Sequence, residues 1–255
     1  MLARPIRLLC YMFALALAVP AAFAKGPSML LSFTPCRLSD PNLNQCIWKA
    51  LDEAIPIIAP GVPRLGLPQM DPYHLKSMEV SKGQSQNQVV FKLRDLDVHG
   101  IRSFAINAIN FDRKTYKCFV GIEARERFIN KGFYEISGRL FMVPVQGKGK
   151  FETWMDNYKS NFTIQFQKIT KDGEYFLEPL HLSKTISVSR IHFHFYNLFN
   201  GNRILGDTVN NLMNQNWEEM LDDFKPTIMK LFDQVFMGYI KTFCQTVPMG
   251  DYLQD

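Results

Sequence analysis

The apolar and polar residues of this chain repeat with different spacings, which divide it into three sections. In the first, apolar residues recur at helical spacing between residues 43 and 58, which predicts an amphipathic helix. Asp40 is expected to cap its start, with Pro41 near the first turn. The helix should end where prolines and glycines cluster between Pro60 and Pro68, and the chain beyond should be extended.

Between about residues 89 and 196 the repeat shortens to two, as in half-buried β-strands. The clearest case is residues 161–167, where Phe162, Ile164 and Phe166 alternate with polar residues. Further strands are expected at residues 89–96, 104–111, 116–124, 133–145, 175–180 and 185–196. Turn-forming residues at 112–114, 130–132, 147–149 and 171–173 would join them into an antiparallel meander with one apolar face.

The third section, residues 205–243, returns to helical spacing. Its apolar stripe includes Leu212, Trp217 and Phe224, while acidic, amide and lysine side chains occupy the other face. A helix of this length is much longer than the average of about 11–12 residues. Pro226 lies within it, so we expect a kink there.

The apolar faces of the long helix and of the strands have no other partner of matching size. The expected fold is therefore α+β, with the long C-terminal α-helix wrapped by a strongly curved antiparallel β-sheet. Phe accounts for 21 of the 255 residues, and many fall on inward positions. Facing surfaces with such large side chains either pack solid or enclose a cavity.

Residues 1–24 have the features of a secretory signal peptide. Arg4 and Arg7 precede a short apolar stretch, and Pro20 comes before a group of small residues. The apolar stretch is too short for the ~20 residues that span a bilayer, so a membrane anchor is disfavoured. We expect export of the protein, and a single domain over residues 25–255.

The charge argues against one class of partner. The formal charge is +5, and it falls to 5 − 2 = +3 when the two arginines of residues 1–24 are removed. Basic and acidic residues alternate along the chain without a basic stripe. Nucleic acid is therefore not expected as a partner.

Four cysteines remain after residues 1–24, namely Cys36, Cys46, Cys118 and Cys244. An even number in an oxidising compartment favours disulfides, and four cysteines allow three pairings. Cys118 and Cys244 are equally compatible with a second bridge and with two buried thiols. A zinc site is disfavoured because no two cysteines are separated by two residues.

Residues 36–75 carry the most distinctive motif. Cys36 and Cys46 enclose an Asp-Pro step, a Pro-Gly-Val-Pro-x-Leu-Gly-Leu-Pro run starts at Pro60, and Asp71-Pro72 follows. This segment resembles the N-terminus of the insect takeout and juvenile hormone-binding protein family, and the element order beyond it is similar to theirs. The resemblance implies a Cys36–Cys46 disulfide. It also implies the tubular lipid-binding fold, in which one helix lies within a rolled antiparallel sheet.

The same resemblance implies a carrier and not an enzyme. Its ligands would be elongated terpenoid or fatty molecules held in an internal tunnel without a cofactor. We expect a monomer in an extracellular fluid such as haemolymph or sensory fluid. The candidate ligand contacts are inward apolar residues of the strands and the long helix: Phe162, Ile164, Phe166, Ile186, Val188, Phe193, Phe195, Leu212, Trp217, Phe224 and Phe232.

Other candidate chemistry is weaker. His192 and His194 alternate on one strand face, but no carboxylate or cysteine stands at a spacing that would complete a metal site. No arrangement of serine, histidine and aspartate can be nominated for catalysis, so a secreted esterase is the least favoured function. The main alternative is a lipid-transfer module with transient membrane or receptor contact. Asn161 begins an acceptor sequence for N-glycosylation.

Overall fold

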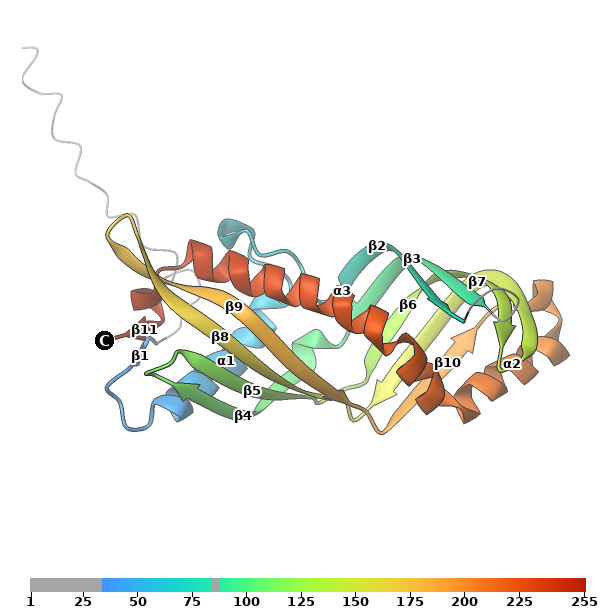
Figure 1. The fold of residues 1–255 in the computed structure, drawn as a ribbon, viewed down its shortest axis with the longest axis horizontal. Helices are drawn as coiled ribbons and strands as arrows, with labels where there is room; N and C mark the ends of the chain where they lie inside the picture. The colour runs from blue at the N-terminus through green and yellow to red at the C-terminus, as the bar shows by residue number, and fades with distance from the viewer. Residues whose placement is uncertain (1–33, 84–87) are drawn as a thin grey trace, which may run out of the picture.

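The computed structural model describes residues 34–83 and 88–255, so the expected signal peptide at residues 1–24 lies outside the described part. The fold is α+β and elongated, and the longest helix, α3 (Trp217–Thr246), runs along its long axis (Figure 1). Two antiparallel sheets lie along this helix, one toward each end of the molecule (Figure 1). The expected fold class is confirmed, with the strands divided between two sheets.

The larger sheet has five antiparallel strands in the order β10-β7-β6-β3-β2. They are β2 (Tyr73–Lys82), β3 (Val89–His99), β6 (Phe128–Leu140), β7 (Val143–Asp156) and β10 (Arg190–Phe195). The smaller sheet has the order β4-β5-β8-β9. Its strands are β4 (Phe104–Asp112), β5 (Lys117–Ala124), β8 (Lys159–Lys171) and β9 (Glu174–Ser187). The expected meander is wrong in detail, because β3 pairs with β6 and β5 pairs with β8.

The segment expected as one strand at residues 133–145 is instead a hairpin. β6 ends at Leu140, β7 begins at Val143, and the intervening Phe141 and Met142 have φ of 49° and 68°. Tight hairpin turns with positive φ usually select asparagine, aspartate or glycine. These two apolar residues therefore carry no turn signal that a sequence pattern could reveal.

The turns expected at residues 130–132 and 147–149 are also wrong, because both stretches lie inside strands. Their glycines mark close approaches of another backbone. A Cβ on Gly132 would lie 2.9 Å from the Arg94 carbonyl oxygen, and one on Gly149 would lie 2.4 Å from the Tyr196 carbonyl oxygen. Glycine inside a strand often has this role. The stretch expected as one strand at 185–196 is likewise divided, between the end of β9 and β10.

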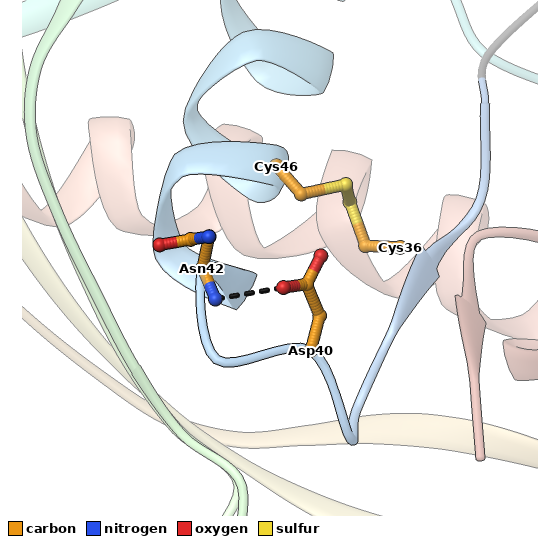
Figure 2. The surroundings of a disulfide bond; sticks show 4 residues. All are labelled: Cys36, Asp40, Asn42 and Cys46. Carbon is orange, nitrogen blue, oxygen red and sulfur yellow. Dashed lines mark hydrogen bonds between the residues drawn. A yellow bond between two sulfur atoms is a disulfide. The ribbon is translucent and has the colours of Figure 1, made fainter.

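Helix α1 (Leu43–Ile58) has the expected bounds, but Asp40 is not its N-cap. Asn42 occupies that position without a capping side-chain hydrogen bond. The Asp40 carboxylate instead accepts a hydrogen bond from the Asn42 backbone N–H at 2.7 Å, and so shapes the loop ahead of the helix (Figure 2).

A disulfide joins Cys36 to Cys46, with their Cα atoms 5.8 Å apart (Figure 2). It ties α1 to the short strand β1 (Cys36–Arg37), which pairs in parallel with β11 (Leu253–Gln254). The pairing that the family resemblance implied is therefore present in the structure. Cys118 and Cys244 are free thiols and both are buried.

The single helix expected over residues 205–243 is two helices. α2 (Arg203–Gln215) and α3 meet at Asn216, whose φ of −112° and ψ of 35° lie outside the helical region. The Asn216 backbone N–H and side-chain amide both donate to the Leu212 carbonyl oxygen, at 3.1 and 2.8 Å, and so close the last turn of α2. Pro226 lies inside α3, and the helix continues through it. The break is therefore at Asn216 and not at the proline.

Short 3-10 helices connect the larger elements, and the motif residue Asp71 holds one of them in place. Its carboxylate is buried and accepts a hydrogen bond from the Arg102 backbone N–H at 2.8 Å. The Arg102 guanidinium lies 3.4 Å from the same carboxylate. The entry to β2 is thereby fixed against residues 101–103. These 3-10 helices are Pro63–Leu65, Ile101–Ser103, Phe199–Gly201 and Met249–Asp251.

Helix α3 is shared by the cores of both sheets. Phe224 meets Phe91 of β3 edge to face, with ring centroids 5.3 Å apart. Further along α3, Phe236 stacks on Phe162 of β8 at 4.7 Å. Burial of a large apolar side chain contributes about 1.5–3 kcal/mol. The two sheets therefore share one helix, and they also meet directly where Phe104 of β4 stacks on Phe128 of β6 with ring centroids 5.8 Å apart.

Candidate functional site: an apolar cavity beneath the long helix

A cavity of about 300 Å³ lies between α3 and the inner face of the five-stranded sheet. Strands β2, β3, β6, β7 and β10 contribute to its walls, as do α3 and the connection from β9 to β10. Nearly all of the lining side chains are aliphatic, aromatic or methionine. Sites for small hydrophobic molecules have this character, with a few polar groups that orient the ligand.

A β-bulge allows β3 to line the cavity along most of its length. Leu93 lines the cavity before the bulge and Leu96 lines it afterwards. In a regular strand, residues three apart point to opposite faces of the sheet. The register of β3 on β6 shifts between Arg94 and Asp97, and Asp95 within the shift has a φ of 47°. The extra residue turns the second half of the strand back toward the cavity.

One face of α3 forms the opposite wall of the cavity. The lining residues recur every three or four positions, as expected for a helix that presents one stripe to a neighbour. Two ion pairs hold this part of α3 to the edge strands of the two sheets. Lys82 of β2 pairs with Asp223 of α3, and Lys184 of β9 pairs with Asp233 of α3. The helix is thereby fixed above the cavity from both sides. The principal lining residues of α3 are Met220, Phe224, Ile228, Leu231, Phe232, Val235 and Phe236.

The structure brings together six of the eleven residues expected to contact ligand. These six line the cavity and come from β9, the β9–β10 connection, β10 and α3: Ile186, Val188, Phe193, Phe195, Phe224 and Phe232.

The other five candidates lie outside the cavity lining. Phe162 is packed behind it, against Phe232 and Phe236. Phe166 packs in a separate cluster with Cys118 and Cys244, toward the disulfide-bonded end. Leu212 and Trp217 lie half-buried on either side of the break at Asn216. Ile164 is buried on β8, within the four-stranded sheet.

Strand β2 contributes cavity residues that the sequence reasoning missed. Tyr73, Leu75, Met78 and Val80 all line the cavity. Apolar residues alternate with polar ones along this stretch, but the alternation shifts by one position at Ser77. A search for alternation that allows one such shift would have found the strand.

Three lining residues other than the tyrosines have polar side chains, namely Asn130, Thr153 and Lys225. Asn130 on β6 and Thr153 on β7 are directly opposite in the strand register. The Asn130 Nδ2 donates to the Thr153 Oγ1 at 3.1 Å. Lys225 lies on the helix side of the cavity.

Burial governs the titratable groups around the cores. It raises the pKa of the Tyr158 hydroxyl in the cavity wall to about 12, and the neighbouring Ser160 hydroxyl opposes the rise. Burial likewise raises the pKa of the Cys118 and Cys244 thiols to about 12. Reactive cysteines instead have lowered pKa values, since the thiolate is the nucleophile. Both thiols are therefore protonated and unreactive at neutral pH.

Within residues 34–83 and 88–255, no group of three or more His, Cys, Asp or Glu side chains is arranged to hold a metal ion. His192 stacks on Trp154 with ring centroids 4.9 Å apart, and its Nε2 lies 3.0 Å from the Asp156 carboxylate. Arg127 pairs with the same carboxylate at 3.2 Å. His192 is therefore part of a polar cluster on the sheet that includes the Asp156–Arg127 ion pair.

Two further observations concern Asn161 and the lengths of the helices. Asn161 is exposed on β8, with Phe162 beside it pointing into the core. Among the helices that the structure describes, none is both long and apolar enough to span a membrane.

Comparisons with known proteins agree with this geometry. The crystal structure of Takeout 1 from Epiphyas postvittana superposes with a TM-score of 0.78, and the match covers 87% of this chain and 99% of that one. The sequences are 24% identical, so this likeness concerns the fold. It confirms the arrangement of a long helix against curved antiparallel sheets.

Relatives are also found by sequence. The circadian clock-controlled protein daywake of Drosophila melanogaster is 20% identical over 227 residues, which are 86% of each chain. The protein of the same name from Drosophila yakuba is 19% identical over the same length. The model of the haemolymph juvenile hormone binding protein (JHBP) family matches residues 10–254. A match over nearly the whole sequence, together with the shared fold, shows that this chain belongs to the haemolymph juvenile hormone binding protein family.

Proposed function

We propose that this protein is a carrier that holds an elongated hydrophobic small molecule in the cavity beneath α3. The observation that carries the proposal is the cavity itself, which is walled on one side by a helix and on the other by a sheet and is lined almost entirely by apolar side chains. Membership of a family described by hormone binding supports a binding role. The protein is a binder, not an enzyme.

The energetics suit a long, flexible ligand. Burial of apolar groups contributes about 0.8 kcal/mol for each CH₂, so a chain of about fifteen carbons would gain on the order of 10 kcal/mol before the entropic costs of binding. Micromolar or tighter binding then requires no covalent bond. The ligand class is a juvenile hormone-like terpenoid, a fatty acid or a related lipid. The name of the family supports the first of these.

The candidate contacts fall into two groups under this proposal. The six expected residues that line the cavity touch the ligand directly, and the β2 residues Leu75, Met78 and Val80 join them. Phe162 does not contact the ligand but stacks against Phe232 and Phe236, and so supports these two residues in the cavity wall.

The carrier acts outside the cell as a monomer. Cleavage after residue 24 leaves one domain over residues 25–255, and Asn161 receives a glycan. The Cys36–Cys46 disulfide supports this setting, because disulfides persist in oxidising compartments.

The test is mass spectrometry of the protein secreted by eukaryotic cells, first in the native state and then after organic extraction. A lipophilic molecule bound in stoichiometric amount would support the carrier and identify its ligand class. Empty protein that also fails to take up the apolar fluorophore N-phenyl-1-naphthylamine would contradict it.

Exchange of ligand with membranes is a second candidate function. Met142 at the tip of the β6–β7 hairpin is 67% exposed, and Ile204 at the start of α2 is 80% exposed. Under this second function, these side chains would contact the lipid surface. Flotation with phosphatidylcholine vesicles tests this function, and loss of binding in the Met142→Ser variant would support it. Protein that stays at the bottom of the gradient would exclude it.

A further inference from the structure

One pair of hydrogen-bonded polar side chains lies in the sheet wall of the cavity. Asn130 and Thr153 face each other on the neighbouring strands β6 and β7, and Phe193 of β10 is the next residue across the sheet. Thr153 is only 8% exposed. All three residues line the cavity, and in the described ranges the side chains of Asn130 and Thr153 are hydrogen-bonded to each other alone.

The pair makes one hydrogen bond, although its side chains could donate and accept several more. Asn130 donates one amide hydrogen to the Thr153 oxygen at 3.1 Å. The Thr153 O–H and the Asn130 carbonyl oxygen make no hydrogen bond to any residue in the described ranges. A threonine hydroxyl can both accept and donate, and an amide carries an acceptor oxygen and two donor hydrogens.

Both residues line the cavity. In the described ranges, the buried side-chain polar atoms that have no hydrogen-bond partner belong to Trp154, Asp251 and Tyr252, so the unpartnered Asn130 carbonyl oxygen is not sealed off. Buried polar groups are unfavourable unless they are paired. A bound molecule with a suitable oxygen would supply the missing partner.

We infer that Asn130 and Thr153 form an anchor that selects ligands carrying an uncharged oxygen, such as a carbonyl, ester or hydroxyl group, over hydrocarbons of the same length. This inference rests on the proposed carrier function and adds a ligand class to it. The Thr153 O–H donates to the ligand oxygen, and the Asn130 carbonyl accepts from a ligand hydroxyl. An uncharged ligand group suits the pair because both side chains are neutral, and the one lysine of the lining is on α3.

A competition between two ligands of matched size tests the inference. Purified protein is equilibrated in the shared vapour of dodecan-2-one and tridecane, which have the same number of heavy atoms, and the bound molecules are extracted and quantified by gas chromatography. The ratio of bound ketone to bound alkane should fall about threefold to tenfold in the Thr153→Val variant. Thr153→Ser retains the hydroxyl and should retain the ratio.

Two further variants separate the anchor from general damage. Asn130→Leu combined with Thr153→Val removes both polar partners at once, so no unpaired group is left buried, and it should lower the ratio as far as the single change. Lys131→Met changes an exposed residue of β6 next to Asn130 that does not line the cavity, and it should leave the ratio unchanged.

The outcomes distinguish this inference from the function on which it rests. Equal ratios in the wild type, Thr153→Val and the double variant, with both molecules still bound, would overturn the anchor and leave the carrier intact. Folded wild-type protein that binds neither molecule nor N-phenyl-1-naphthylamine would overturn the carrier itself.

Discussion

Lys184 on β9 forms an ion pair with Asp233 on α3, and its ammonium also donates to the Met229 carbonyl oxygen at 2.8 Å. The lysine side chain is 3% exposed, whereas the aspartate side chain is 48% exposed. The Lys184 ammonium also lies 4.5 Å from the Phe232 ring centroid, in the wall of the cavity. One side chain thus joins the smaller sheet to the helix that closes the cavity.

Replacement of Lys184 by methionine should lower the free energy of unfolding by about 1–2 kcal/mol, because hydrogen bonds to a charged group are lost while the apolar stem is kept. Lys49 provides the matched control, since its side chain is 72% exposed and lies 3.9 Å from Glu53. Lys49→Met should cost less than about 0.5 kcal/mol. Urea denaturation measures both, and equal losses would refute a special role for Lys184.

A charge placed in the cavity wall should abolish ligand uptake. Phe224 is buried against Phe91 and lines the cavity, so Phe224→Asp should prevent uptake of N-phenyl-1-naphthylamine. Phe133 is an exposed phenylalanine of β6, and Phe133→Asp should leave uptake unchanged. Fluorescence titration of both variants provides the measurement.

Because Phe224→Asp places a charge in the core and can prevent folding, a second variant with an apolar side chain is needed to test uptake. Leu93→Trp adds volume within the cavity while it keeps the wall apolar. It should lower uptake in a protein whose circular dichroism is native. Full uptake by folded Leu93→Trp protein would place the binding site elsewhere.

Loss of the Cys36–Cys46 disulfide should destabilise the protein. The two cysteines are 10 residues apart, and closure of such a loop contributes about 3 kcal/mol through the entropy of the unfolded chain. The double variant Cys36→Ser/Cys46→Ser should lose about that amount in urea denaturation. Dithiothreitol should have the same effect on wild-type protein and none on the variant.

The buried thiols should make stability fall at alkaline pH. Burial raises the pKa of Cys118 and Cys244 to about 12, whereas a thiol in an unfolded chain has a pKa of about 8.5. Above pH 8.5 the unfolded chain binds fewer protons than the folded protein, so the stability present at lower pH is lost progressively up to pH 12. Cys118→Ala should reduce the slope between pH 9 and 10. An unchanged slope would contradict this assignment.

Asn161 should carry a glycan when the protein passes through a eukaryotic secretory pathway. The residue is exposed on β8 and begins the sequence Asn161-Phe162-Thr163. Mass spectrometry should show a loss of mass after treatment with peptide N-glycosidase. Asn161→Gln should show no such loss, and wild-type protein without a glycan would refute the prediction.

The parts of the fold that follow from local periodicity could be predicted. Helix α1 has its expected bounds, and Phe162 and Ile164 are buried as the alternation of β8 requires. The break between α2 and α3 could not be placed, because Pro226 carries a strong local signal that the helix tolerates. Asn216 carries a weak signal, yet the chain leaves the helix there.

Which residues line the cavity depends on how the strands pair, and the hydrophobic periodicity of the sequence does not predict the pairing. Alternation identifies Phe166 and Phe195 equally as inward residues, but it does not say to which sheet each strand belongs. Only Phe195 lines the cavity, because β10 joins the larger sheet and β8 the smaller one. The inward orientation of Leu96 depends on the bulge at Asp95, where the register of β3 on β6 shifts.

The pairing of β1 with β11 sets Cys36 beside Leu253, which is 253 − 36 = 217 residues further along the chain. Contacts between residues so far apart raise the contact order, and proteins of high contact order fold slowly because the entropy of loop closure must be overcome first. A nascent chain cannot make this contact until Leu253 has left the ribosome. This end of the molecule therefore folds only after residue 253 has emerged, and until then the apolar cluster that contains Cys118, Cys244 and Leu253 is incomplete and prone to aggregation.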